Sequence, residues 1–188
     1  MTLAPERPLT VEPAVEDDGY GPSFEIVNGE KVEKIMSFES QIVGGNIGFE
    51  LSLHLRETGI GGIAVTEPFI VCFDWMPTTK RRPDVAYWRR EQYPNGVPPR
   101  GDAAIAPALA VEVLSPGENA FELDTKLAEY FRAGVELVWV VNPKTRTVRA
   151  EQPDGSAHVY RDGEELPGSP VLPDFRVPIA KLFPKVDR

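Results

Sequence analysis

Two apolar segments separated by an amphipathic one constrain the fold of this chain more than any other feature. Residues 108–114 and 135–141 are almost continuously apolar, which is typical of central strands that are covered on both faces of a sheet. Between them, residues 120–133 repeat apolar side chains at helical spacing and end before Gly134, a residue that favours helix termination. This strand, helix and strand predict a βαβ unit with a parallel strand pair, and therefore an α/β domain.

Antiparallel hairpins are expected on both sides of this unit, so the central sheet should be mixed and flanked by helices. Asn28-Gly29 is a strong two-residue turn signal within an N-terminal hairpin at 24–35. A C-terminal hairpin is expected at 147–160. One or two strands are predicted within 60–74, with a break near Pro68, and another strand at 83–88.

The segment after the first hairpin has the pattern of a long helix. Ser37 is a suitable N-cap for a helix over 38–57, and Gly59 follows it as a natural stop. Three glycines weaken this helix locally but would let it lie close to a sheet; they are Gly44, Gly45 and Gly48. No Lys-Ser/Thr pair follows them, which argues against a phosphate-binding loop.

Composition indicates one domain and limits what the protein can bind. The chain has 188 residues, and we expect a flexible, acidic, proline-rich leader at 1–22 before a single domain at 23–188. No apolar run approaches the ~20 residues that a membrane span needs, and a single cysteine, Cys72, favours a reducing cytoplasm over a disulfide framework. The net charge of −9 counts against a broad basic surface for nucleic acid without excluding a local one.

Glu112 is the residue that most needs a chemical explanation. Its neighbours from Ala108 to Leu114 are all apolar, and a carboxylate in such a strand is costly to bury unless it is paired, protonated or bound to metal. Asp84 stands at the start of another predicted strand, directly after Pro83. Two carboxylates on neighbouring strands, at one end of a sheet, can bind a hard cation such as Mg²⁺ or Mn²⁺.

Lys126 is the third member of this candidate site. The helix at 120–133 begins soon after the strand of Glu112, so a residue in its early turns can point back toward the end of that strand. A lysine next to a metal-bound water can orient it, help to remove its proton or stabilise charge on a phosphoryl group. The alternatives without a catalytic role are that Asp84 belongs to a turn, that Lys126 is a solvated surface residue, or that Glu112 and Lys126 form a purely structural ion pair.

The same residues carry a resemblance to a known family. Pro83-Asp84, the string Glu-Val-Leu-Ser-Pro at 112–116, and Lys126 followed by Tyr130 resemble the Uma family of restriction-endonuclease-like proteins, in the PD-(D/E)xK nuclease superfamily. The resemblance implies a restriction-endonuclease-like core and an endonuclease that depends on Mg²⁺ or Mn²⁺ and acts on nucleic acid, with DNA as the expected substrate. It implies catalytic roles for Asp84, Glu112 and Lys126, and metal ligation by Asp84, Glu112 and the carbonyl of Val113.

The chain also departs from the superfamily pattern. The usual lysine lies two residues after the second acid, and that position is Leu114 here, so the resemblance implies that Lys126 has taken its place. A histidine that is common near the start of the first helix is replaced by Ser40 or Gln41. The resemblance further suggests accessory residues, for which the candidates are Glu33, Glu39, Glu122, Asp124 and Tyr130.

Basic residues on either side of Asp84 are the best candidates for phosphate contacts in this acidic protein, although a solvated surface is the alternative for each. The candidates are Arg81, Arg82 and Arg89, with Lys80, Arg90 and Arg100 close to them in sequence.

Three hypotheses follow for function. The leading one is a metal-dependent endonuclease with its site at Asp84, Glu112 and Lys126. The second is a binding or regulatory module on a nuclease-like fold with weak or silent catalysis, which the acidic composition favours. The third is a structural Glu112–Lys126 pair with function elsewhere. A homodimer is expected by analogy, because cutting both strands of a duplex needs two sites.

Overall fold

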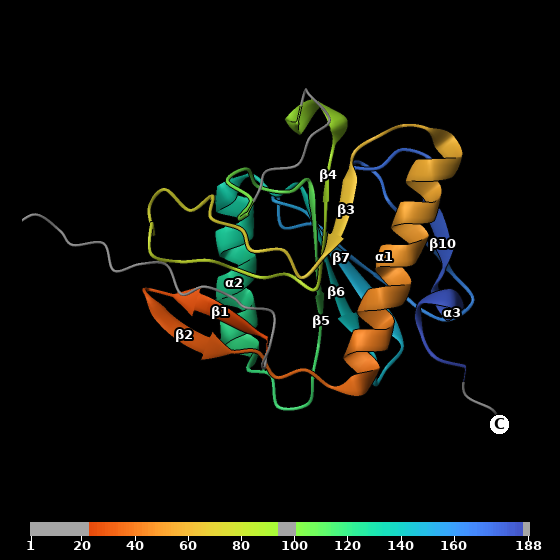
Figure 1. Ribbon diagram of the computed structural model, residues 1–188. Helices are drawn as coiled ribbons and strands as arrows, with labels where there is room; N and C mark the ends of the chain where they lie inside the picture. Colours follow the sequence, from red (N-terminus) through yellow and green to blue (C-terminus); the bar gives the residue numbers. More distant parts are fainter. Residues whose placement is uncertain (1–22, 94–100, 186–188) are drawn as a thin grey trace, which may run out of the picture.

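The computed structural model describes residues 23–93 and 101–185, and it contains a six-stranded central sheet (Figure 1). The predicted leader at 1–22 and Arg100 lie outside the described residues. The strands follow one another in the order β3 (Ile63–Thr66), β4 (Val85–Trp88), β5 (Leu109–Val113), β6 (Leu137–Asn142), β7 (Thr147–Glu151) and β8 (Ala157–Tyr160). Only β5 and β6 in this sheet are parallel, so the prediction of a mixed sheet built around one βαβ unit is confirmed.

The two long helices cover opposite faces of the sheet (Figure 1). Because successive strand residues point to opposite faces, Val85 and Val111 pack with α1 (Phe38–Thr58), whereas Ala86 and Ala110 pack on the side of α2 (Ala120–Ala133). Each helix therefore closes one half of the core, and the two halves share the strands β4, β5 and β6.

Helix α1 begins and ends where the sequence predicts. The Ser37 side chain accepts a hydrogen bond from the N–H of Ser40, and Gly59 ends the helix with a φ of 67° in the left-handed region. A Cβ atom at Gly48 would lie 3.1 Å from Cγ2 of Thr66 in β3. Because Gly48 has no side chain, α1 lies close to the sheet, as the glycines in its sequence predict.

The N-terminal hairpin lies apart from the central sheet, beside α2 (Figure 1). It consists of β1 (Phe24–Val27) and β2 (Glu30–Glu33), joined by Asn28 and Gly29 with positive φ values. Main-chain hydrogen bonds of 3.0 Å and 2.7 Å join Ile26 and Lys80 in both directions. This attachment places β1 against the segment that leads into β4.

Of the one or two strands predicted within 60–74, the structure contains one. Only β3 forms, and beyond Glu67 the chain makes single bridges, from Ile70 to Arg81 and to Ala103. Glu67 has a φ of 49°, which interrupts the extended chain. Pro68 follows it and has no main-chain N–H to donate to a neighbouring strand.

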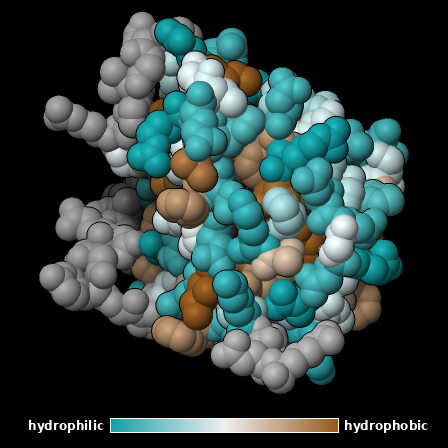
Figure 2. All heavy atoms as spheres, turned by 90° about the vertical axis from the view of Figure 1, so that its right-hand side faces the viewer, coloured by the Kyte–Doolittle hydropathy of each residue, from teal (hydrophilic) through white to brown (hydrophobic). Residues whose placement is uncertain are grey.

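The C-terminal part packs on the α1 side of the molecule. It contains β9 (Glu165–Pro167), β10 (Arg176–Pro178) and the short helix α3 (Ile179–Leu182), and it contributes Leu166, Val177 and Ile179 to the core. Figure 2 shows this side, where hydrophilic residues cover most of the surface and the apolar areas between them are small. Within the described residues, no helix combines the length and the apolar character that crossing a membrane requires.

Candidate active site

Glu112 lies in the central strand β5 on the face that α2 covers, with 2% of its surface exposed. Its Oε2 atom lies 3.0 Å from Nζ of Lys126, and its Oε1 atom accepts a 2.7 Å hydrogen bond from the hydroxyl of Tyr130. Lys126 and Tyr130 are four residues apart, so they lie on the same face of α2 and reach the carboxylate together. The contact between Lys126 and the strand of Glu112 is the one that the helix spacing predicts.

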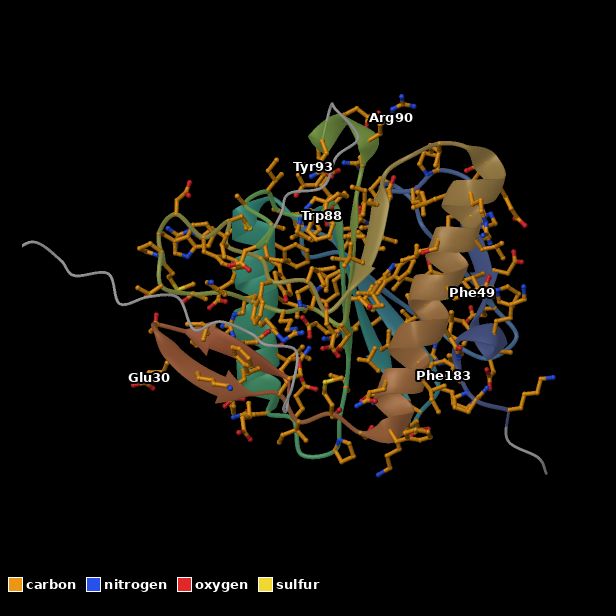
Figure 3. The ribbon with its side chains drawn as sticks, in the orientation of Figure 1. Glu30, Phe49, Trp88, Arg90, Tyr93 and Phe183 are labelled. Carbon is orange, nitrogen blue, oxygen red and sulfur yellow. The ribbon has the colours of Figure 1, made fainter. Side chains whose placement is uncertain are left out.

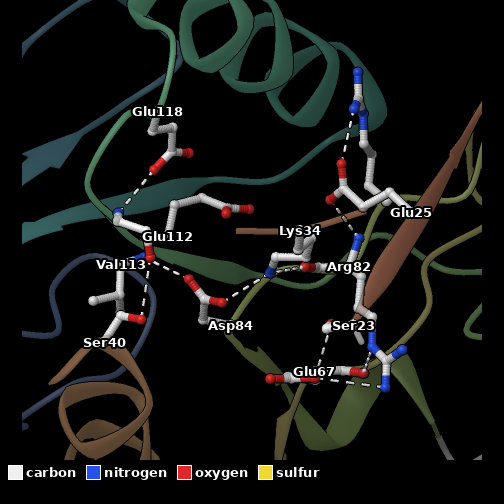
Figure 4. Close-up of polar contacts among 12 residues, drawn as sticks. Ser23, Glu25, Lys34, Ser40, Glu67, Arg82, Asp84, Glu112, Val113 and Glu118 are labelled. Atoms are coloured by element: carbon white, nitrogen blue, oxygen red, sulfur yellow. Dashed lines mark hydrogen bonds and ion pairs between the residues drawn. The ribbon is translucent and has the colours of Figure 1, made fainter. Parts of the chain in front are cut away.

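Asp84 lies just before β4 and is joined to the end of β5 (Figure 4). Its Oδ2 atom accepts a 2.6 Å hydrogen bond from the main-chain N–H of Val113, the residue after Glu112. Its Oδ1 atom lies 2.8 Å from Nζ of Lys34, which also donates to the carbonyl of Arg82 at 2.7 Å. Asp84, Glu112 and Val113 line one cavity of about 520 Å³ between the N-terminal hairpin and α2.

A further carboxylate, Glu25 in β1, completes the arrangement and was not expected from the sequence. It is 5% exposed, and its Oε1 atom lies 2.9 Å from Nζ of Lys126 and accepts a 2.9 Å hydrogen bond from the N–H of Arg82. Its Oε2 atom accepts from Arg81 at 2.9 Å. A signal was available, because Glu25 stands between Phe24 and Ile26 as Glu112 stands among apolar residues, but the docking of the hairpin is a tertiary feature.

The charges of this cluster shift one another's pKa values. Burial raises the pKa of Glu112, and the attraction of Lys126 opposes this only in part. Burial also acts on Glu25, but Lys126, Arg81 and the hydrogen bond from the Arg82 main chain outweigh it and lower the pKa of Glu25 to about 2. Burial disfavours the Lys126 ammonium, yet the carboxylates of Glu112 and Glu25 raise its pKa above the ordinary value. Lys126 is therefore an ammonium at neutral pH.

The other acidic candidates lie at different distances from this centre. Glu33 and Glu122 line the same cavity as Asp84 and Glu112. Glu39 lines a neighbouring cavity of about 540 Å³ together with Leu114, and Asp124 is exposed on α2. Ser40 and Gln41 line a third cavity, which Asp84 also borders, and Leu114 packs against the hydrophobic core beneath α2.

Each of the three arginine candidates for phosphate contacts has an acidic partner. Arg81 is buried and bonds Glu25 and Glu129, while Arg82 donates to the carbonyl of Glu67 at 2.9 Å. Arg89 pairs with Glu136 and lies between the last residue of β4 and the short 3₁₀ helix at Arg90–Gln92, at the end of β4 away from Asp84. Its neighbours Trp88 and Arg90 mark this end of the strand in Figure 3. Their phosphate contacts stay a prediction.

Mg²⁺ and Mn²⁺ prefer oxygen ligands, and the candidate site offers the carboxylates of Asp84 and Glu112. In the part of the chain that the structure describes, no three His, Cys, Asp or Glu side chains gather closely enough to hold a metal ion. Mg²⁺, however, commonly takes one or two carboxylates and completes its shell with waters. A carboxylate offers about four lone-pair sites, and the contacts described above use two at Asp84 and two at Glu112. The residues present therefore fit such an ion.

The mixed central sheet with α1 and α2 on its opposite faces has the restriction-endonuclease-like fold. Residues 12–180 match the model of the Uma2 family, described as "Putative restriction endonuclease", and the chain belongs to this family. The crystal structure of a putative nuclease belonging to DUF820 from Anabaena variabilis ATCC 29413 has the same fold, with a TM-score of 0.70 and 19% sequence identity over 86% of this chain and 90% of that chain. No curated protein sequence matches the chain. The predicted family and fold class are confirmed.

Proposed function

We propose that this protein is a divalent-metal-dependent endonuclease that hydrolyses phosphodiester bonds in nucleic acid, with DNA as the expected substrate. The observation that carries the proposal is Glu112, a carboxylate that is 2% exposed in a core strand, is bonded to a buried lysine and lines the same cavity as Asp84. Burying such a charge is costly, so its retention in the core fits a chemical role. Membership of the Uma2 family, described as "Putative restriction endonuclease", supports the same reaction.

Asp84, Glu112 and the carbonyl oxygen of Val113 are the groups that would hold Mg²⁺ or Mn²⁺. When bound, such an ion supplies a Lewis acid and lowers the pKa of a coordinated water. The main-chain N–H of Val113 holds Asp84 at the end of β5, and the hydroxyl of Tyr130 on α2 holds Glu112. These two contacts orient the carboxylates toward one cavity.

We assign Lys126 the role of a positively charged hydrogen-bond donor and not that of a general base. Its Nζ atom lies 3.0 Å from Glu112 and 2.9 Å from Glu25, and these two carboxylates raise its pKa. An ammonium has three N–H donors, of which the two carboxylates account for two. We assign the third to the attacking water or to a phosphoryl oxygen, where a positive charge stabilises the transition state.

Three further residues are assigned supporting roles. Tyr130 orients Glu112 through its 2.7 Å hydrogen bond, and Glu33 and Glu122 line the cavity, where they can influence the binding of metal or substrate. Glu39 and Asp124 are assigned no role in this cavity, because one lines a neighbouring cavity and the other is exposed on α2.

Cleavage of DNA and RNA by the purified protein tests the proposal, with Mg²⁺ or Mn²⁺ added and with EDTA as the blank. We expect metal-dependent cleavage that falls at least about 100-fold in Glu112→Gln and Lys126→Ala, because each variant removes a charge from the site. Lys181→Ala, which removes an exposed lysine on α3, is the matched control and should cleave normally. Intact substrate under all these conditions would overturn the proposal.

A binding or regulatory module without turnover is the second candidate. The net charge of −9 and the pairing of Arg81, Arg82 and Arg89 with acidic residues favour it. Binding assays with labelled nucleic acid would support this candidate if affinity persists without cleavage. If calorimetry shows that the folded protein binds no divalent metal, the third hypothesis is favoured, in which Glu112 and Lys126 form a structural ion pair and function lies elsewhere.

Two copies would provide two sites for the two strands of a duplex, so we propose a homodimer, which light scattering on the purified protein would detect. A reducing cytoplasm fits the single cysteine, because one thiol cannot form a disulfide within the chain.

A further inference from the structure

The residue after the N-terminal hairpin, Lys34, bonds the carboxylate that we propose as a metal ligand. Its Nζ atom lies 2.8 Å from Oδ1 of Asp84, and the two side chains are only 12% and 13% exposed. Both residues line the cavity that contains Glu112 (Figure 4). A lysine ammonium therefore occupies one side of Asp84 within the candidate site.

Lys34 is held less firmly than the other two cations of this cavity. Lys126 bonds two carboxylates, Glu112 and Glu25, and Arg81 bonds Glu25 and Glu129. The described contacts of the Lys34 ammonium are one carboxylate and one main-chain carbonyl, that of Arg82. Losing Asp84 as a partner would thus leave Lys34 with the weaker of its two contacts.

A divalent ion on Asp84 would lie close to this ammonium. Mg²⁺ binds carboxylate oxygens at about 2.0–2.1 Å, so an ion on Asp84 and the Lys34 Nζ atom would be separated by only a few ångströms. Asp84 has lone pairs to spare, but like charges at such a separation repel, and the low exposure of both side chains lets solvent screen the repulsion only in part. The two cations can share Asp84 only at a cost to the binding of each.

We propose that Lys34 and a divalent metal ion compete for Asp84, and that the displaced ammonium is the phosphate contact of this wall of the cavity. The inference rests on the proposed metal site. The main-chain N–H of Lys34 donates to the carbonyl of Ser23 at 2.8 Å, so the backbone is anchored and the flexible side chain is the part that moves. Lys34 thereby lowers the affinity for metal and presents a cation to the substrate once metal binds.

Calorimetric titration with Mn²⁺, without nucleic acid, tests the competition in the full chain. Lys34→Met should bind Mn²⁺ with a Kd about tenfold lower than that of the unmodified protein, since a neighbouring positive charge is removed. Lys31→Met removes an exposed lysine from the same hairpin and should change the Kd by less than about twofold. An unchanged or higher Kd in Lys34→Met overturns the competition, whereas binding by none of the three proteins removes the proposed metal site itself.

A second measurement needs no variant and covers the case in which Lys34→Met does not fold. Amine-reactive labelling of the unmodified protein, read by mass spectrometry, should increase several-fold at Lys34 when Mn²⁺ or Ca²⁺ is added. Labelling of Lys31 should stay the same. Equal labelling of Lys34 with and without metal, at concentrations where calorimetry shows binding, would contradict the displacement.

Discussion

The Oε1 atom of Glu25 lies 2.9 Å from the Nζ atom of Lys126, although the first belongs to the N-terminal hairpin and the second to α2. Lys126 therefore lies between two buried carboxylates, Glu25 and Glu112, and not in a single ion pair. The hairpin is a wall of the site, because it supplies Glu25 to the lysine, while Lys34 beyond β2 bonds the aspartate, Asp84.

Glu25→Gln should destabilise the protein in a pH-dependent way. The pKa of Glu25 is about 2 in the folded protein against 4.5 ordinarily, so its ionised form contributes stability above pH 4.5 that is lost as the pH falls toward 2. The shift corresponds to about 3 kcal/mol at pH 7. Urea unfolding at several pH values should show this difference shrinking below pH 4.5. Glu30→Gln, on the same hairpin but exposed, should show no difference; a constant loss for Glu25→Gln at every pH would refute the linkage.

Lys126→Met should lower the free energy of unfolding by about 3–5 kcal/mol at pH 7, because Glu112 and Glu25 would remain buried without their shared ammonium. Adding Glu112→Gln to this variant should restore part of the loss, since the carboxylate that has lost its cation becomes neutral, whereas Glu25 still bonds Arg81. A double-mutant cycle measured by urea unfolding reports this coupling. Strict additivity of the two changes would argue against a direct interaction.

Tyr130→Phe tests the hydrogen bond to Oε1 of Glu112, the carboxylate oxygen that Lys126 does not bond. The substitution leaves Oε1 of Glu112 without its 2.7 Å donor in a fully buried position, which should cost about 1–3 kcal/mol of stability. The same variant should bind Mn²⁺ more weakly, because the carboxylate is no longer oriented. Unfolding and calorimetric titrations that both match those of the unmodified protein would exclude this role.

Gly48→Val tests the close packing of α1 on the sheet. A Cβ atom at this position lies 3.1 Å from Thr66 Cγ2, so the larger side chain should cost about 1–3 kcal/mol by overpacking. Gly45→Ala is the control, because nothing lies within 4 Å of its added Cβ, and it should stabilise the helix by up to about 1 kcal/mol. Thermal unfolding should move the two melting temperatures in opposite directions.

Most secondary structure could be predicted from local patterns in the chain. The helix expected at 120–133 is α2, Ser37 and Gly59 bound α1, and the parallel pair of β5 and β6 follows from the spacing of two apolar runs. The region at 60–74 was less predictable, because β3 is short and the chain beyond Glu67 makes only single bridges. Its conformation depends on the segments at Arg81 and Ala103, which lie far away in sequence.

The candidate site divides in the same way. Asp84, Glu112 and Lys126 could be selected from the sequence, since a carboxylate in an apolar strand and a lysine on the next helix are local observations. The contacts of Glu25 and Lys34 could not be predicted from the sequence, because no spacing of residues along the chain indicates where the N-terminal hairpin attaches. The partners of the arginines near Asp84 could not be predicted either, because Arg81 is paired with Glu25 and Glu129 and is not a solvated surface residue.

The sequence by itself determined the elements, the order of the βαβ unit and the buried charges that require partners, because periodicity and composition are properties of neighbouring residues. Only the tertiary structure decided which partners those charges have. An ion pair between Glu25 and Lys126 depends on the docking of β1 against the segment before β4, through Ile26 and Lys80. Such docking arises from packing and main-chain hydrogen bonds across the whole domain, which no local pattern encodes.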